Sequence, residues 1–299
     1  MPVTPPSTAF LRNALAIVKP KSGVTPGTIT QCPTAAQITA ITDNTDCAQF
    51  LSGGKSFLYV LPSASLDIAD YLTADGNKNF KFFTLLISSD FAAADLADLD
   101  AGSFAGVAAY AFTDKAAAKT FAAQTNRCGF YALSSNKSTN MFFSFSSLLG
   151  APSWDSRQYI ELPASEGITE LGDAEALFED RVSFVLSSEQ YGNRLAFFAA
   201  GGKAITAAYI KEEIRISQQG RALTYIQMNK PDYTITEAKL LQGYLQKQLD
   251  AYVEAKTVSS ARAEVTVTED GNFQAGGNIY IPEPKALWRL AGKLTQEVA

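Results

Sequence analysis

Short apolar runs bounded by glycine, proline and polar turn residues dominate the first 200 residues of the chain. Runs of roughly four to eight residues with such boundaries are typical of buried strands. The first is Ala14–Val18, which lies between Asn13 and Lys19-Pro20. The others expected are 57–61, 81–87, 107–112, 130–133, 181–186 and 194–200.

Helical segments are expected between these strands. Residues 34–50 fit one or two short helices, and Asp90 and Asp114 each stand where a helix would begin. In the helix after Asp114, the spacing of Ala118, Phe121 and Ala122 predicts a buried face. Alternating strands and helices indicate βαβ units. The expected fold is therefore α/β, with a mixed or largely parallel sheet and flanking helices.

The last third of the chain has a different pattern, which predicts an α+β region. A helix is expected over residues 205–228, interrupted or kinked near Gly220. Thr234 and Glu237 form a capping-box pattern at the start of a second helix. Strands at 263–268 and 278–281, on either side of an acidic turn at 269–271, should follow. The residues predicted to line the buried face of the second helix are Ala238, Leu241, Leu245, Leu249 and Tyr252.

These patterns divide the chain into four parts. An N-terminal arm is expected over 1–33 and an α/β core over 34–200. A helix-rich assembly region over 201–284 and a C-terminal strand arm over 285–299 complete the division.

An apolar strand pattern near each end of the chain suggests pairing with another subunit. Chain ends usually fray unless they are tied down, and strand addition to a neighbour's sheet would do so. Repeated donation in one direction gives a ring or a helical filament. The alternative, equally supported by the periodicity, is that both strands complete a sheet in their own subunit. The residues concerned are Ala14, Leu15, Ala16, Ile17 and Val18, and Leu287, Trp288, Leu290 and Leu294, with Arg289 and Lys293 on the opposite face.

The composition fits an ordinary folded protein and disfavours several partners. The hydrophobic fraction is 46%, the charged fraction 18% and the formal net charge −5. Negative charge gives no general attraction to nucleic acid, so no nucleic-acid partner is expected. The polar, proline-rich start and the lack of an apolar run of about 18 residues predict cytosolic synthesis without a membrane span.

The chain has no histidine, and this excludes whole classes of catalytic site. Serine or cysteine nucleophiles activated by histidine, and histidine-ligated metals, are ruled out. The three cysteines, Cys32, Cys47 and Cys128, show no metal-binding spacing, although a bridge between Cys32 and Cys47 stays open. No enzymatic activity, cofactor or metal is predicted.

The sequence contains no convincing phosphate-binding motif. Gly53-Gly54-Lys55-Ser56 resembles the end of a P-loop, but Gln49 replaces the first glycine and a strand follows where a helix is needed. No GxGxxG follows any expected strand. The first motif is therefore interpreted as a turn into a core strand.

Acidic pairs and a phenylalanine cluster are also interpreted structurally. The pairs Asp95/Asp98, Glu212/Glu213 and Glu269/Asp270 fit solvated helix faces or a turn better than metal or acid–base sites. The phenylalanines at 142, 143 and 145 fit core packing or a subunit contact.

Three stretches resemble the contractile tail sheath proteins of bacteriophages and related injection machines. Residues 50–60 resemble the family's Phe-x-x-Gly-Gly turn into a core strand, with Ser52 in place of asparagine and Leu61-Pro62 where an arginine is usual. The C-terminal third repeats the family's order of helix, long helix, strand, acidic turn, a Gly276-Gly277 start and a terminal strand. Residues 14–18 match the family's N-terminal arm in position.

The resemblance implies a structural subunit of a contractile tail sheath, in a compact form without outer domains. Such a subunit polymerises as helically stacked rings around an inner tail tube and contracts to drive the tube through a cell envelope. The implied partners are other copies of itself, the tube protein, and baseplate and terminator proteins. The implied location is the virion tail, assembled in the host cytoplasm. By the same analogy, Lys211, Arg215 and Arg221 face the tube, unless they are solvated residues of an amphipathic helix.

Two other functions remain open from the sequence alone. One is another ring-forming tail component, a terminator or a tube protein, which the βαβ pattern disfavours because tubes are usually built from barrel-like subunits. The other is a small-molecule enzyme or binding protein on an α/β scaffold. A polar cluster at the carboxyl ends of the core strands would support that second function.

Overall fold

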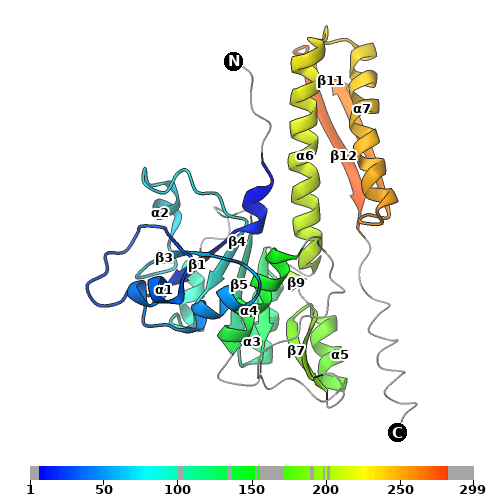
Figure 1. Cartoon of the computed structure of the whole chain (residues 1–299). Helices are drawn as coiled ribbons and strands as arrows, with labels where there is room; N and C mark the ends of the chain where they lie inside the picture. The colour runs from blue at the N-terminus through cyan, green and yellow to red at the C-terminus, as the bar shows by residue number, and fades with distance from the viewer. Residues whose placement is uncertain are drawn as a thin grey trace. The chain divides into compact units, whose positions relative to one another are not determined.

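The computed structural model describes residues 7–99, 104, 106–124, 126–132, 137–151, 154, 171–188, 192–197, 199–200 and 203–281. The chain divides into two compact units (Figure 1). The α/β unit contains Ala9–Ala208, and the helical unit contains Tyr209–Glu283. The division falls inside helix α6 (Ile205–Asn229), near the boundary expected at 200/201.

An eight-stranded sheet forms the centre of the α/β unit, in the order β2-β3-β1-β4-β5-β6-β7-β8. A two-residue pair, β9 (Ala199–Ala200) and β10 (Lys203–Ala204), forms a separate small sheet. The main strands are β1 (Ala14–Val18), β2 (Thr30–Cys32), β3 (Leu58–Pro62), β4 (Thr84–Ile87), β5 (Val107–Phe112), β6 (Arg127–Tyr131), β7 (Ser183–Ser188) and β8 (Gly192–Phe197).

The sheet is largely parallel, as the sequence predicts. The strands from β3 through β7 all run parallel to their neighbours. Strands β2 and β8, at the two edges, run antiparallel to β3 and β7. The expected α/β class with a mixed sheet is thereby confirmed.

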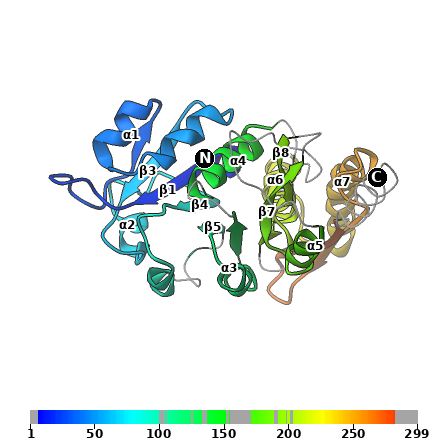
Figure 2. The ribbon, with the colours of Figure 1, turned by 90° about the horizontal axis from the view of Figure 1, so that it is seen from below.

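Helices cover both faces of this sheet. Figure 2 shows α1 and α4 on one side of the strands and α2 and α3 on the other. The helices shield both faces of the central strands from solvent, and every residue of β1 and β5 is buried. The helices of this unit are α1 (Ala35–Ile41), α2 (Ala69–Thr73), α3 (Lys115–Ala122), α4 (Lys137–Gly150) and α5 (Leu171–Glu179), with 3₁₀ helices η1 (Ala9–Arg12), η2 (Asp46–Ser52) and η3 (Ala93–Asp98).

Strand β1 lies at the centre of the sheet, and its position corrects one prediction. Leu15 is opposite Tyr59 of β3 on one side and Leu85 of β4 on the other. Both hydrogen-bonding edges of Ala14–Val18 are therefore used within the chain, and no edge remains for a neighbour. The prediction that this segment is an arm donated to another subunit is wrong, and so is an N-terminal arm that includes it.

Of the two aspartates expected to begin helices, one does so. The Asp114 carboxylate accepts the Ala117 amide hydrogen at 2.7 Å and caps α3. Ala118, Phe121 and Ala122 of that helix are buried, as expected. Asp90 does not cap a helix, because its carboxylate binds side chains of neighbouring loops and η3 begins after Ala92.

The helical unit combines two long helices with a hairpin. Helix α6 runs without a break through Gly220, whereas an interruption or kink was expected there. Thr234 caps α7 (Ile235–Glu254) by accepting the Glu237 amide hydrogen at 3.3 Å, but Glu237 itself accepts a hydrogen bond from Tyr225. Strands β11 (Ser260–Val267) and β12 (Phe273–Tyr280) pair antiparallel across the expected acidic turn.

Substitution of Asp114 by alanine should lower the free energy of unfolding by about 1 kcal/mol, since the α3 amides lose their cap. Asparagine at the same position keeps an acceptor oxygen and should restore most of that loss. Urea unfolding followed by circular dichroism measures both. Equal stability of the alanine variant and the parent would contradict the assigned cap.

Candidate assembly interface

The β11–β12 hairpin offers one open hydrogen-bonding edge. On the β11 side, Gln246 of α7 accepts the Ala263 amide hydrogen at 2.8 Å and donates to the Ala261 carbonyl at 3.1 Å. A side chain of the same unit thus covers that edge. On the β12 side, no strand pairs with the second edge within the described part of the chain.

The register identifies which groups of β12 face outward. Ala261 and Ala263, whose backbone groups point away from β12, are opposite Ile279 and Gly277. In an antiparallel ladder such opposite residues both turn their backbone groups away from each other, so Gly277, Ile279 and, two residues earlier, Ala275 point to the open edge. Residues 274–278 are exposed. An unpaired edge of this kind is a template for an added strand.

Gly276 and Gly277 lie inside β12, whereas the sequence placed them at the start of a strand. A Cβ on Gly277 would come within 3.4 Å of the Ala263 Cα and meet the Arg262 carbonyl, so glycine is needed for the close approach of the two strands. A Cβ on Gly276 would meet nothing within 4 Å. The sequence does not indicate that β12 could accept an added strand, because small polar residues are poor strand formers.

The helical unit also exposes large apolar side chains. Within the described residues, all large hydrophobic side chains classed as exposed belong to it: Met228 (78%), Ile235 (72%), Tyr280 (65%), Leu240 (57%) and Tyr233 (47%). Tyr233 packs against Phe273 of β12 with ring centroids 4.7 Å apart. Exposed apolar side chains gathered on one unit are typical of a surface that binds another protein.

The three basic residues predicted to face a tube do not share one surface of α6. Lys211 and Arg215 are both exposed and lie four residues apart, on one face of the helix. The Arg215 guanidinium forms an ion pair with Glu212 and donates a hydrogen bond to its carboxylate. That hydrogen bond raises the pKa of Arg215. Arg221 lies on a different face and stacks on Tyr244 of α7.

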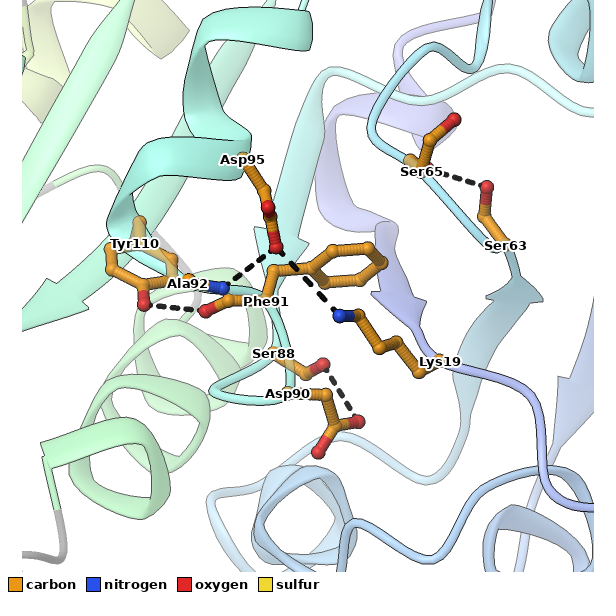
Figure 3. A network of polar contacts seen from close by, with 9 residues as sticks. All are labelled: Lys19, Ser63, Ser65, Ser88, Asp90, Phe91, Ala92, Asp95 and Tyr110. Atoms are coloured by element: carbon orange, nitrogen blue, oxygen red, sulfur yellow. Dashed lines mark hydrogen bonds and ion pairs between the residues drawn. The ribbon is translucent and has the colours of Figure 1, made fainter.

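A polar cluster lies at the carboxyl ends of β1 and β4, where α/β proteins commonly bind ligands (Figure 3). The chain leaves β1 toward β3 and leaves β4 toward β5, so the strand order diverges there. Lys19 follows β1, and its Nζ lies 3.7 Å from the Asp95 carboxylate. That carboxylate also accepts the Ala92 amide hydrogen at 2.8 Å.

The acidic side chains of this cluster hold loops together. Asp90 accepts hydrogen bonds from Ser88 at 3.1 Å and from Asn44 at 2.8 Å. Tyr110 donates to the Phe91 carbonyl at 2.7 Å, and burial together with Asp95 raises the pKa of this tyrosine. A raised pKa keeps the Tyr110 proton in place as a structural hydrogen bond.

The buried ring of Phe91 lies among these polar side chains. Its side chain is 1% exposed, and the Lys19 ammonium lies 5.2 Å from its ring centroid (Figure 3). The polar cluster that would support an enzyme or a small-molecule binder is present. However, its carboxylates bind the loops around them, and a buried aromatic ring lies among them.

The Gly53-Gly54-Lys55-Ser56 segment packs against helix α4. Ser146 accepts the Lys55 amide hydrogen at 3.0 Å, and Ser147 donates to the Gly53 carbonyl at 2.8 Å. A Cβ on Gly53 would meet the Phe143 carbonyl and lie 2.7 Å from the Ser146 Cβ. The segment leads directly into β3, which confirms its interpretation as a turn into a core strand.

The cysteines and the remaining acidic pairs also have structural roles. Cys32, Cys47 and Cys128 are free and buried, so the possible bridge between Cys32 and Cys47 is not formed. Burial, Asp90 and Asp46 raise the pKa of Cys47 well above its ordinary value. The pair at 269–270 forms the hairpin turn completed by Gly271 at φ +74°. The described residues contain no group of three or more acidic or cysteine side chains placed to hold a metal.

The predicted C-terminal arm, with Leu287, Trp288, Leu290 and Leu294, lies outside the described residues. Of the phenylalanine cluster, Phe142 and Phe145 are buried in the α/β unit. None of the helices among the described residues has the length and apolar character needed to cross a membrane.

Solved structures with a similar architecture include chains of contractile-sheath and baseplate assemblies. A chain in the contracted helical sheath of the anti-feeding prophage aligns at TM-score 0.65 and 14% identity, over 95% of this chain and 92% of that one. A chain in the contracted PVC sheath complex, an extracellular contractile injection system, aligns at 0.67 and 10% identity, over 94% and 90%. The chain has the contractile-sheath fold.

A third structure extends the likeness to a bacterial sheath tail protein. The protein, from Desulfitobacterium hafniense, aligns at TM-score 0.54 and 9% identity, over 94% of this chain and 99% of that one. No family model and no curated protein matches the sequence. The contractile-sheath fold is therefore recognisable from the backbone arrangement, although the sequences are only 9–14% identical.

Substitution of Gly53 by alanine should destabilise the α/β unit by about 1–3 kcal/mol, because the added methyl group overpacks the contact with α4. Gly76, whose added Cβ would meet nothing within 4 Å, is the matched control, and its alanine variant should be as stable as the parent. Urea unfolding measures both. Equal stability of the two variants would contradict the packing role of Gly53.

Proposed function

We propose that this protein is the structural subunit of a contractile sheath, without enzymatic activity. It polymerises as helically stacked rings around an inner tube and contracts to drive the tube through a target envelope. One observation carries the proposal: 94–95% of the chain aligns with 90–92% of the chains of two contracted sheath assemblies. The open edge of β12 supports it independently, since a polymer needs a repeating contact.

The subunits are joined by strand addition to β12. The donor is residues 287–294 of a second copy, whose alternating pattern puts Trp288 and Leu290 on one face. Pro282 and Pro284 favour extended backbone between β12 and this segment, which disfavours an immediate return onto the same hairpin. Backbone hydrogen bonds then supply affinity, and the apolar face supplies specificity.

Contraction is a rigid-body rearrangement between two packings of different free energy. The α/β unit suits this role because its central strands are buried on both faces and its loops are tied by internal hydrogen bonds. Strand pairing keeps neighbouring subunits connected while their packing changes. No nucleotide is required for such a rearrangement.

The other partners follow from the same function. The inner tube is held by complementary charge at Lys211 and Arg215, while baseplate and terminator proteins close the two ends of the sheath in a virion tail or related particle. Charge reversal at Lys211 and Arg215 should lower co-sedimentation of the sheath with purified tubes while leaving self-assembly intact. Unchanged co-sedimentation would remove this assignment.

Electron microscopy of the purified protein at high concentration tests the function. Tubes or stacked rings of uniform width are expected. Monodisperse particles that persist after addition of the tube protein would contradict a sheath and favour the small-molecule enzyme or binding protein.

Deletion of residues 287–299 should abolish these tubes, because the donor strand is removed while the β12 edge is left open. The point variant Trp288→Asp should act in the same way, whereas Arg289→Gln, on the opposite face of the donor pattern, should assemble like the parent. Circular dichroism verifies that each variant is folded. Long regular tubes from the deletion variant would rule out this donor.

A further inference from the structure

Arg221 stacks on an aromatic ring and has a buried nitrogen without a hydrogen-bond partner among the described residues. Its Nε is buried and has no hydrogen-bond partner among the residues that the structure describes. The guanidinium carbon lies 4.6 Å from the centroid of the Tyr244 ring on α7. The residue as a whole is only partly buried, so part of it is accessible to a partner.

This arrangement is typical of a prepared binding residue. Stacking on Tyr244 orders the guanidinium plane before any partner arrives, so less conformational entropy is lost on binding. A planar guanidinium offers two parallel N–H groups to a carboxylate. Arginine and tyrosine are also the residue types that most often dominate the energy of protein interfaces.

The acidic turn of the hairpin is the complementary surface. Glu269 and Asp270 are adjacent and exposed, and within the described part of the chain neither carboxylate has a hydrogen-bond or ion-pair partner. Four other carboxylates of the helical unit are engaged: Glu212 with Arg215, Glu237 with Tyr225, Asp250 with Gln246, and Glu264 with Arg262. Asp232 and Glu254 are exposed single carboxylates, whereas the turn places two negative charges side by side.

We propose that Arg221 of one copy binds the Glu269–Asp270 turn of the next copy. The two surfaces differ, so the contact is heterologous, and its repetition builds an open array instead of a closed pair. The inference rests on the proposed polymerisation and names a second contact in it, separate from strand addition. It also assigns Arg221 to subunit association and separates it from Lys211 and Arg215.

Substitution of Arg221 should weaken assembly without unfolding the protein. The Arg221→Gln variant should raise the lowest concentration at which tubes form by roughly ten- to thirty-fold, as expected for an interface arginine. Arg221→Lys keeps the positive charge but loses the two parallel N–H groups of the guanidinium, so it should show most of the rise in the assembly threshold. Arg262→Gln is the matched control in the same unit and should change the threshold less than about twofold, since the exposed ion pair of Arg262 with Glu264 contributes little.

A charge exchange tests the pairing directly. The variants Arg221→Glu and Glu269→Arg/Asp270→Arg should each fail to assemble alone, and an equimolar mixture should form alternating arrays detected by sedimentation. No association in the mixture, or an unchanged threshold for Arg221→Gln, would overturn this contact while leaving a polymerising parent protein intact. Failure of the parent protein to polymerise at any concentration would instead overturn the proposed function and this contact with it.

Discussion

An unpaired strand edge is the constraint on which the proposed assembly depends. The β11–β12 hairpin is only two strands wide, and such a hairpin gains stability from packing or from further strands. Helix α7 covers β11 and closes its outer edge through Gln246. The outward backbone groups of β12 remain open, because no described strand pairs with them. Soluble proteins usually protect such an edge, and a subunit that must polymerise needs one.

The α/β unit has the opposite design. Its central strand β1 is paired on both sides and covered on both faces, so it offers nothing to a neighbour. The ring of Phe91 is buried at the carboxyl ends of β1 and β4, and the surrounding carboxylates hold the loops through hydrogen bonds. A block of this kind can change its packing against neighbours without changing its own shape. The open strand edge and the exposed large apolar side chains found among the described residues thus belong to the helical unit.

Most of the fold could be predicted from local patterns. Buried parallel strands such as β5 are continuous apolar runs, and Asp114 and Thr234 mark helix starts through their side-chain oxygens. The role of Ala14–Val18 could not be predicted, because an apolar strand has the same pattern in its own sheet as in a neighbour's. The prediction that Asp90 begins a helix failed for a related reason, since its partners Asn44 and Thr42 lie more than 40 residues away and only the tertiary structure brings them close.

The interface was harder to predict than the fold. Strand β12 is rich in glycine and polar residues, and its importance lies in backbone groups that carry no sequence signal. The separation of Arg221 from Lys211 and Arg215 follows from its packing against Tyr244 on another helix. Charge patterns along one helix do not contain that information.

The most direct measurement is complementation between two variants that each lack one half of the strand contact. Deletion of residues 287–299 removes the donor, and Ala275→Pro removes an outward amide of β12 while sparing the β11 ladder. Each variant alone should sediment as a monomer, and an equimolar mixture should form discrete pairs that cannot extend, with Gly276→Ala as an assembling control. A mixture that remains monomeric would contradict the account, as would polymers formed by either variant alone.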